Sequence, residues 1–252
     1  MSDNDVLFTY LLRLADDQLI LGQRLGEWCG NAPTLEEDLA LTNISLDLIG
    51  QARSLYSYAG EVEGKGRDED QLAFVRYEQD YLNALIAEQP NGDFAHTIVR
   101  QFFVSAFMAP FWREMEKSSD NTLAAIAAKA SKEVAYHLRH TSEWVVRLGD
   151  GTDESHERMV EALEDLVMYT GELFESDGLV KAAIEAGFAV DVASLQDEWK
   201  RTVDSVLKEA TLELPEAGHM QSGGREGRHT EHLGHILSEL QYMQRAYPGM
   251  SW

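Results

Sequence analysis

Four polar residues interrupt otherwise apolar helical seams, each near the middle of its predicted helix: Gln18, Gln51, Ser105 and His137. Mid-helix positions of an antiparallel bundle share one depth, so these side chains are predicted to form a single polar layer. Di-iron carboxylate proteins place their ligands at this depth, with one Glu on each of two helices and a Glu-x-x-His pair on each of the others. The layer is therefore the first place to look for metal chemistry.

The residues of this layer suit iron poorly, because iron in such sites prefers carboxylate and imidazole ligands. The suitable donors nearby are Glu133 and His137, one helical turn apart, with Asp17 and Asp47 at the seam edges. They fall short of the about six ligands that a di-iron cage needs. We interpret the layer, with Glu133, as a vestigial set of buried polar groups satisfied by hydrogen bonds. A metallo-oxidase that uses Glu133, His137, Asp17 and Asp47 is the rival hypothesis.

An acidic residue stands three positions before a histidine four times, always in a predicted loop or at a helix start. The pairs are Asp93/His96, Asp153/His156, Glu216/His219 and Glu226/His229. A motif outside its structural context is only a hypothesis, and we interpret these four as chance matches. The sequence has no GxGxxG after a strand, no P-loop and no CxxC, and the single cysteine, Cys29, is predicted to be a packed thiol. No catalytic or metal-binding residue is predicted.

A segment near the C-terminus concentrates glycine, arginine and histidine in an otherwise acidic chain. Its residues are Gly223, Gly224, Arg225, Arg228, His229 and His232. Glycine allows close backbone approach, and arginine is favoured at interfaces because its planar fork binds carboxylates. The segment is therefore the predicted surface for a partner protein. Two alternatives stay open: an anion-binding loop before a helix N-terminus, and an ordered loop that packs on its own bundle.

The elements that must position these residues are helices. Apolar residues recur at helical spacing from 7 to 28, 41 to 58, 94 to 112, 123 to 144 and 233 to 247. Further helices are predicted over 68–88, 155–176 and 191–210, with a loop at 60–66, an irregular segment at 213–229 and a kink at Pro110. No run alternates as a strand would. We predict an all-α, ferritin-like antiparallel bundle with additional C-terminal helices, as one domain of residues 1–252.

Charge excludes several classes of partner. Asp and Glu number 44 against 21 Lys and Arg, a formal net charge of −23. Such a surface repels nucleic acid and anionic lipid, and it is a poor main site for polyanions such as coenzyme A. The sequence has no basic, apolar leader and no run of about 18 apolar residues, and one cysteine suits a reducing compartment. A cytoplasmic protein is expected.

Five stretches together resemble one bacterial family. They are LGQRLGEWCGNAP (21–33), DLALTNISLDLIGQARSLYSYAGE (38–61), EQPNGDFAHTIVRQFF (88–103), KEVAYHLRHTSEWVVRLGDGTD (132–153) and GGREGRHTEHLGHILSELQYMQR (223–245). The sequence resembles, nearly end to end, the structural (C-type) subunits of ring-1,2-phenylacetyl-CoA epoxidases. The resemblance implies a scaffold without its own cofactor, paired with a homologous di-iron catalytic subunit, with further small subunits and a reductase. Self-association is left open.

The resemblance also bears on the metal ligands. Catalytic relatives carry D-E-x-G-H on the second helix, where this sequence has Asp47, Leu48, Ile49, Gly50 and Gln51. The resemblance thus implies that Leu48 replaces the metal-binding Glu and Gln51 the His. The Glu-x-x-His of the fifth helix becomes Glu-Val-Ala-Tyr from residue 133, with a histidine one place late at 137.

Overall fold

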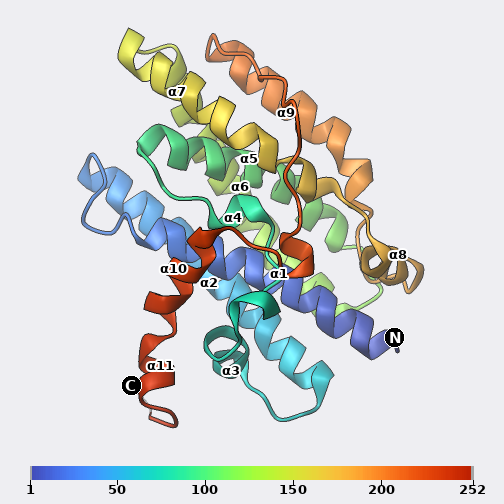
Figure 1. The fold of residues 1–252 in the computed structure, drawn as a ribbon. Helices are drawn as coiled ribbons and strands as arrows, with labels where there is room; N and C mark the ends of the chain where they lie inside the picture. The colour runs from blue at the N-terminus through green and yellow to red at the C-terminus, as the bar shows by residue number, and fades with distance from the viewer. Residues whose placement is uncertain (1, 251–252) are drawn as a thin grey trace. The chain divides into compact units, whose positions relative to one another are not determined.

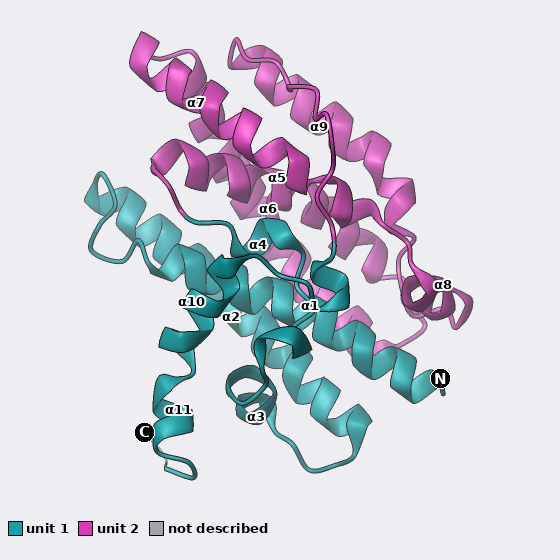
Figure 2. Cartoon of the chain, viewed as in Figure 1, with its two compact units in different colours: residues 1–90, 223–252 teal, residues 91–222 magenta. Residues whose placement is uncertain are grey.

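A computed structural model describes residues 2–250, and these residues contain helices and no strand. Figure 1 shows the helices in chain order, and Figure 2 shows the two compact units into which the chain divides. Unit 1 combines Met1–Pro90 with Gly223–Trp252, and unit 2 is Asn91–Ser222. The all-α fold class is confirmed. The assignment of residues 1–252 to one domain stays a prediction.

Unit 1 is built on a hairpin of two long helices, α1 (Asp3–Gly26) and α2 (Leu35–Glu63). Ser2 and Thr34 cap their N-termini with side-chain oxygens, which satisfies amides that the helices leave free. Asp16 contacts Tyr56, and the Ser45 hydroxyl donates to the carbonyl of Gly22, so the helices run antiparallel. Leucines and isoleucines at helical spacing fill the seam between them.

Shorter elements complete unit 1. They are α3 (Glu69–Phe74), η1 (Glu78–Asp80), α4 (Leu85–Glu88), η5 (Gly224–Glu226), α10 (Glu231–Leu240) and α11 (Tyr242–Ala246). The prediction of one helix over 68–88 is wrong, because backbone amides at 82 and 84 bond to carboxylates of α1. The loop predicted at 60–66 is wrong in its first half, since α2 runs on to Glu63 and Gly64 ends it in the left-handed region.

Unit 2 is built on a second antiparallel hairpin, α5 (Phe94–Met115) and α6 (Asn121–Gly149). The rings of Phe94 and Trp144 meet edge to face at 5.0 Å, at the end of the hairpin away from its short connection. Helix α5 includes Pro110, and the kink there stays a prediction.

The other elements of unit 2 are α7 (Asp153–Leu166), η2 (Val167–Tyr169), η3 (Gly171–Phe174), α8 (Gly178–Glu185), η4 (Val192–Leu195) and α9 (Gln196–Glu209). The helix predicted over 155–176 therefore ends ten residues early in two 3-10 turns, and α8 was not predicted. A cluster of aromatic rings from α5, η3 and α9 forms part of the core.

Two long antiparallel hairpins are the elements from which ferritin-like bundles are built. Two smaller findings concern predictions made above. Cys29 is exposed, so the prediction of a packed thiol is wrong; the thiol follows the end of α1, where the chain turns toward α2. Within residues 2–250, no helix is long and apolar enough to cross a membrane.

Candidate functional site

The residues of the predicted polar layer are buried, and they divide between the two units. Gln18 and Gln51 are 0% and 2% exposed in unit 1, and Ser105 and His137 are each 1% exposed in unit 2. The Ser105 hydroxyl accepts a hydrogen bond of 3.1 Å from the Gln101 amide. Their burial agrees with the seam analysis, while their grouping into one layer stays a prediction.

The two α2 positions at which the resemblance implies metal ligands lie in the packed interior. Leu48 and Gln51 lie three residues apart, so they share one face of α2, and each is 2% exposed. A leucine side chain has no donor atom for a metal, and an amide is a poor iron ligand. Two buried side chains that share one face of α2 are thus unsuited to bind iron, and their descent from a ligand pair stays a prediction.

Two of the other candidate ligands, Glu133 and Asp17, form ion pairs. Glu133 pairs with Lys129 of the same helix at 3.4 Å, and its side chain is 17% exposed. Asp17 binds an arginine, as described next. Among residues 2–250, no group of three or more His, Cys, Asp and Glu side chains is placed to hold a metal ion. Within either unit, the described donor side chains therefore form no cluster suited to a di-iron centre, and the absence of a metal from the chain stays a prediction.

Buried charges gather instead in unit 1, around two consecutive acids in the middle of α1. The carboxylate of Asp17 accepts two bonds from the Arg225 guanidinium, at 3.0 and 2.8 Å, and one from the amide of Ala84 at 2.8 Å. Arg225 also donates to the carbonyls of Leu82 and Arg13. Burial raises the pKa of Asp17, and the Arg225 guanidinium acts against this rise.

The neighbouring acid, Asp16, is fully buried and anchors a different segment. Its carboxylate accepts bonds from the guanidinium of Arg76 and from the hydroxyl of Tyr56, and it accepts one of 2.8 Å from the amide of Leu82. Arg76 lies over the ring of Tyr81 at 4.3 Å. Burial, and then the charge of Asp16, raise the pKa of Tyr56 well above its usual value, so this hydroxyl stays protonated. The hydroxyl can therefore donate to the Asp16 carboxylate.

A third acid, Glu88, fixes the start of α10. One of its oxygens accepts bonds from the amide and hydroxyl of Thr230, at 2.6 and 2.8 Å. The other lies 2.8 Å from Nδ1 of His229, whose Nε2 lies 2.8 Å from the carbonyl of Tyr81. Both ring nitrogens thus face acceptors, which favours the imidazolium. Burial lowers the pKa of His229, but the bonds to Glu88 and Tyr81 outweigh it and raise the pKa above its ordinary value.

The segment over residues 223–230, which we name the C-terminal strap, therefore packs on its own unit. A Cβ atom on Gly224 or Gly227 would clash with the carbonyl oxygen of Asn83 or Gln79, which explains the glycines. Arg225 and His229 serve the network already described, as the self-packing alternative expected.

Two residues of the predicted partner surface remain accessible. The Arg228 side chain is 67% exposed beside Glu226, and His232 is half-buried. For these two positions, contact with a partner stays a prediction. For Gly223 and Gly224, which are both buried, the observed contacts are intramolecular.

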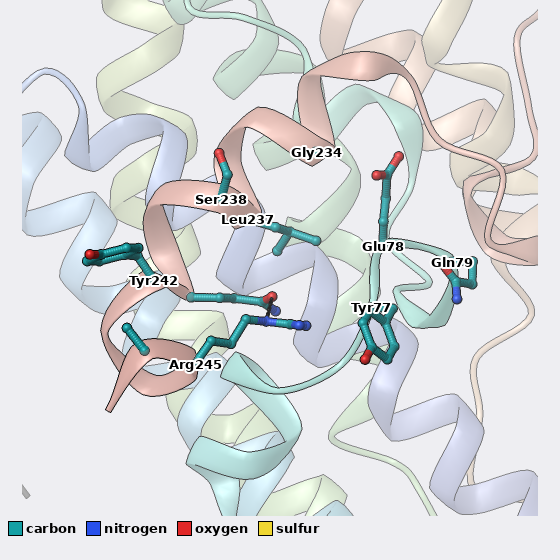
Figure 3. A pocket seen from close by; sticks show the side chains of 10 residues that line it. Tyr77, Glu78, Gln79, Gly234, Leu237, Ser238, Tyr242 and Arg245 are labelled. Atoms are coloured by element: carbon teal, nitrogen blue, oxygen red, sulfur yellow. Dashed lines mark hydrogen bonds between the residues drawn. The ribbon is translucent and has the colours of Figure 1, made fainter. Parts of the chain in front are cut away.

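A shallow groove of about 630 Å³ lies beside this network, between residues 77–79 and the helices α10 and α11 (Figure 3). Tyr77, Glu78 and Gln79 face Gly234, Leu237, Ser238, Gln241, Tyr242, Arg245 and Ala246 across it. Arg245 lies over the ring of Tyr77 at 4.8 Å and donates to the carbonyls of Val75 and Arg76. Its guanidinium thus ties α11 to the rest of the unit.

Sequence reasoning missed Asp16, Arg76 and Glu88, although one signal was present. The run Ala-Asp-Asp-Gln at 15–18 places two acids in the middle of an apolar helix, where charged residues are rare unless they are paired. Pairing was therefore predictable, but the partners were not. The acids of this network are paired with arginine or histidine side chains of the same unit. These pairs hold the segments that pack on α1 in place.

Comparison with known proteins decides the family. The sequence matches the family described as "Phenylacetic acid catabolic protein" over residues 1–252. The chain belongs to this family. It is 51% identical over 246 residues to an Escherichia coli (strain K12) protein named as a subunit of 1,2-phenylacetyl-CoA epoxidase, an alignment that covers 98% of this chain and 99% of that one. That relative is the C-type subunit, so the resemblance found in the sequence is confirmed. The coverage places the α1–α2 hairpin and the C-terminal strap inside the region shared with it.

Proposed function

We propose that this chain is the non-catalytic, structural subunit of a multicomponent monooxygenase that epoxidises the ring of phenylacetyl-CoA. Its partner would be a homologous catalytic subunit that carries the di-iron centre, joined by further small subunits and a reductase. One observation carries the proposal. Leu48 and Gln51 are buried on α2 at the positions where the resemblance implies metal ligands, in a chain 51% identical to a C-type epoxidase subunit.

The buried network supports a structural role. Arg225 and His229 tie the C-terminal strap to Asp17 and Glu88 of the same unit. Charged side chains inside a protein are tolerated when they are paired and hydrogen-bonded, and these pairs leave no acid poised to act on a substrate. The chain would thus offer its partner a preformed surface that needs no metal for its folding.

The two rival hypotheses have less support. A metallo-oxidase would need Asp17, which Arg225 and the Ala84 amide already bind, and Glu133, which pairs with Lys129. An anion-binding strap would need Arg225, whose guanidinium is already neutralised by a carboxylate.

Metal content and assembly test the proposal. The chain should be produced with iron supplementation, alone and together with its candidate catalytic subunit. We expect no stoichiometric iron or manganese in the isolated chain, stable co-purification with the partner, and epoxidation only when the partner is present. About two metal ions per isolated chain, the content of a di-iron site, would contradict the proposal.

The accessible part of the strap offers a second test. Replacement of Arg228 and His232 by Ala should weaken binding to the catalytic subunit several-fold, since truncated interface anchors cost about 2 kcal/mol or more. The matched control is Arg113→Ala, which removes an exposed ion pair with Glu198 in unit 2. Unchanged co-purification of the double variant would place the interface elsewhere.

A further inference from the structure

One asparagine of the sequence is followed by glycine, and it lies at the start of unit 2. This is Asn91 before Gly92, whereas the other five asparagines precede Asp, Ala, Ile, Ala and Thr. Glycine has no side chain to shield its backbone nitrogen, so this nitrogen can reach the side-chain carbonyl carbon of the residue before it. Attack there closes a five-membered imide, and for this reason Asn-Gly is the asparagine pair most prone to lose its amide in peptides. The pair is a candidate site of spontaneous modification.

The structure leaves the attacking nitrogen available. Gly92 is exposed in the segment that precedes α5, with a φ of +57° in the left-handed region that favours glycine. Within residues 2–250, its amide donates to no backbone carbonyl. A backbone amide outside regular hydrogen bonding gives up its proton to water readily, as hydrogen exchange shows. The nitrogen can therefore lose its proton and turn toward the Asn91 side chain while the chain stays folded.

The side-chain amide under attack is held and polarised by residues of α5. The Arg100 guanidinium donates to Oδ1 of Asn91 at 2.6 Å, and the Thr97 hydroxyl lies 3.4 Å from the same oxygen. That hydroxyl also donates to the backbone carbonyl of Asn91 at 3.0 Å. Arg100 and Thr97 are 1% and 0% exposed, so packing fixes both donors in place. Attack on the amide carbon places negative charge on Oδ1, and donors already aimed at a developing oxyanion lower the barrier.

We propose that Asn91 is a self-modification site, at which the folded chain converts this asparagine to aspartate and isoaspartate with the help of the Arg100 guanidinium. The backbone nitrogen of Gly92 bonds to Cγ of Asn91, and the Cγ–Nδ2 bond breaks. The proton of the attacking nitrogen passes through water to the departing nitrogen, which leaves as ammonia. A water molecule then adds to one of the two imide carbonyls, which gives aspartate or isoaspartate. The proposal is independent of the function proposed above.

The two products differ in their effect on the start of unit 2. Aspartate keeps the backbone and puts a carboxylate oxygen where Oδ1 now meets Arg100, so the hydrogen bond becomes charge-assisted and stronger. Isoaspartate lengthens the backbone by one carbon just before Asp93, whose carboxylate caps α5 by accepting from the amide of His96 at 2.9 Å. The reaction therefore changes the charge, or the length, of the segment through which the chain enters α5.

The test incubates the full chain for several days at mildly alkaline pH, with digestion at acidic pH and mass mapping of the peptides. The peptide that holds Asn91 should exchange its amide for a carboxyl at least about tenfold faster than any peptide that holds another asparagine, because only Asn91 precedes glycine. Mass is the readout, since isomerisation at Asp150-Gly151 or Asp177-Gly178 leaves it unchanged. A protein isoaspartate methyltransferase should label the modified peptide, because the imide also opens to isoaspartate. An Asn91 that stays unchanged in the folded chain, or that gives aspartate without isoaspartate, would overturn the proposal.

Two variants test the donors. Arg100→Met should slow the conversion of Asn91 about tenfold in the folded chain, because the oxyanion loses its nearer donor, and should leave the rate in urea unchanged. The matched control is Arg113→Met, which removes an exposed guanidinium paired with Glu198 in the same unit and should convert as wild type does. If circular dichroism shows that Arg100→Met does not fold, Thr97→Val keeps the side-chain shape, removes the farther donor and should slow conversion about twofold. Equal rates in folded wild type and in the folded donor variant would overturn the proposal.

Discussion

Removal of Arg225 is the sharpest test of the buried network. Arg225→Ala leaves the Asp17 carboxylate buried with the Ala84 amide as its remaining partner among the bonds described above. Loss of one partner of a buried ion pair costs about 3–5 kcal/mol, because the other charge stays uncompensated. For a chain of this size, each kcal/mol corresponds to about 2–4 °C, so we expect the melting temperature to fall by about 10 °C.

The pH dependence of this loss gives a second readout. Burial already raises the pKa of Asp17, and without Arg225 the pKa of the folded state rises further. A carboxyl whose pKa is higher in the folded than in the unfolded state loses stability as pH rises between the two values. The deficit of Arg225→Ala should therefore be small near pH 4, close to the ordinary pKa of aspartate at about 3.9, and larger at pH 8.

The measurement is unfolding followed by circular dichroism at several pH values. The control is Arg158→Ala, which removes an exposed pairing with Glu154 and Asp93 and should leave the melting temperature nearly unchanged. A second variant, Arg225→Met with Asp17→Leu, replaces both charges by apolar groups and should recover much of the loss. A deficit in Arg225→Ala no larger than in Arg158→Ala, or one independent of pH, would refute the reasoning.

Three further predictions concern the same unit. His229→Gln removes the imidazolium beside Glu88. Because the pKa of His229 is raised in the folded state, the stabilisation that this imidazolium gives should be complete below about pH 6.5 and disappear as pH rises through the folded pKa. The measurement is the difference in unfolding free energy between wild type and variant at several pH values. Gln51→Leu should change the unfolding free energy by no more than about 1–3 kcal/mol and leave epoxidation by the assembled complex intact, whereas lost turnover with normal assembly would show that this position takes part in chemistry. Gly224→Ala should detach the C-terminal strap, because the new Cβ clashes with the carbonyl of Asn83. Limited proteolysis should then cut the chain rapidly near residue 224. The control Gly178→Ala, whose Cβ meets no other atom within 4 Å, should be cut no faster than wild type.

The sequence by itself determined the long helices of the two hairpins and the buried face of α2 that holds Leu48 and Gln51. Helical periodicity is a local signal, since a buried face repeats every three to four residues whatever the rest of the chain does. The inward position of Gln51 followed from its place among Leu48 and Leu55, and the structure buries it as that pattern required.

Tertiary structure alone decided that the predicted helix at 68–88 is interrupted and that the C-terminal strap packs on its own unit. Both depend on partners far away in the chain: Arg225 reaches Asp17 across 208 positions, and the amide of Leu82 bonds to Asp16 across 66. A buried carboxylate must find donors, and which donors it finds depends on where the folded chain brings them. The two acids Asp16 and Asp17 thus indicated that each would pair with a buried positive charge. Only the folded unit showed that the partner of Asp17 is Arg225, which the sequence had placed at a partner surface.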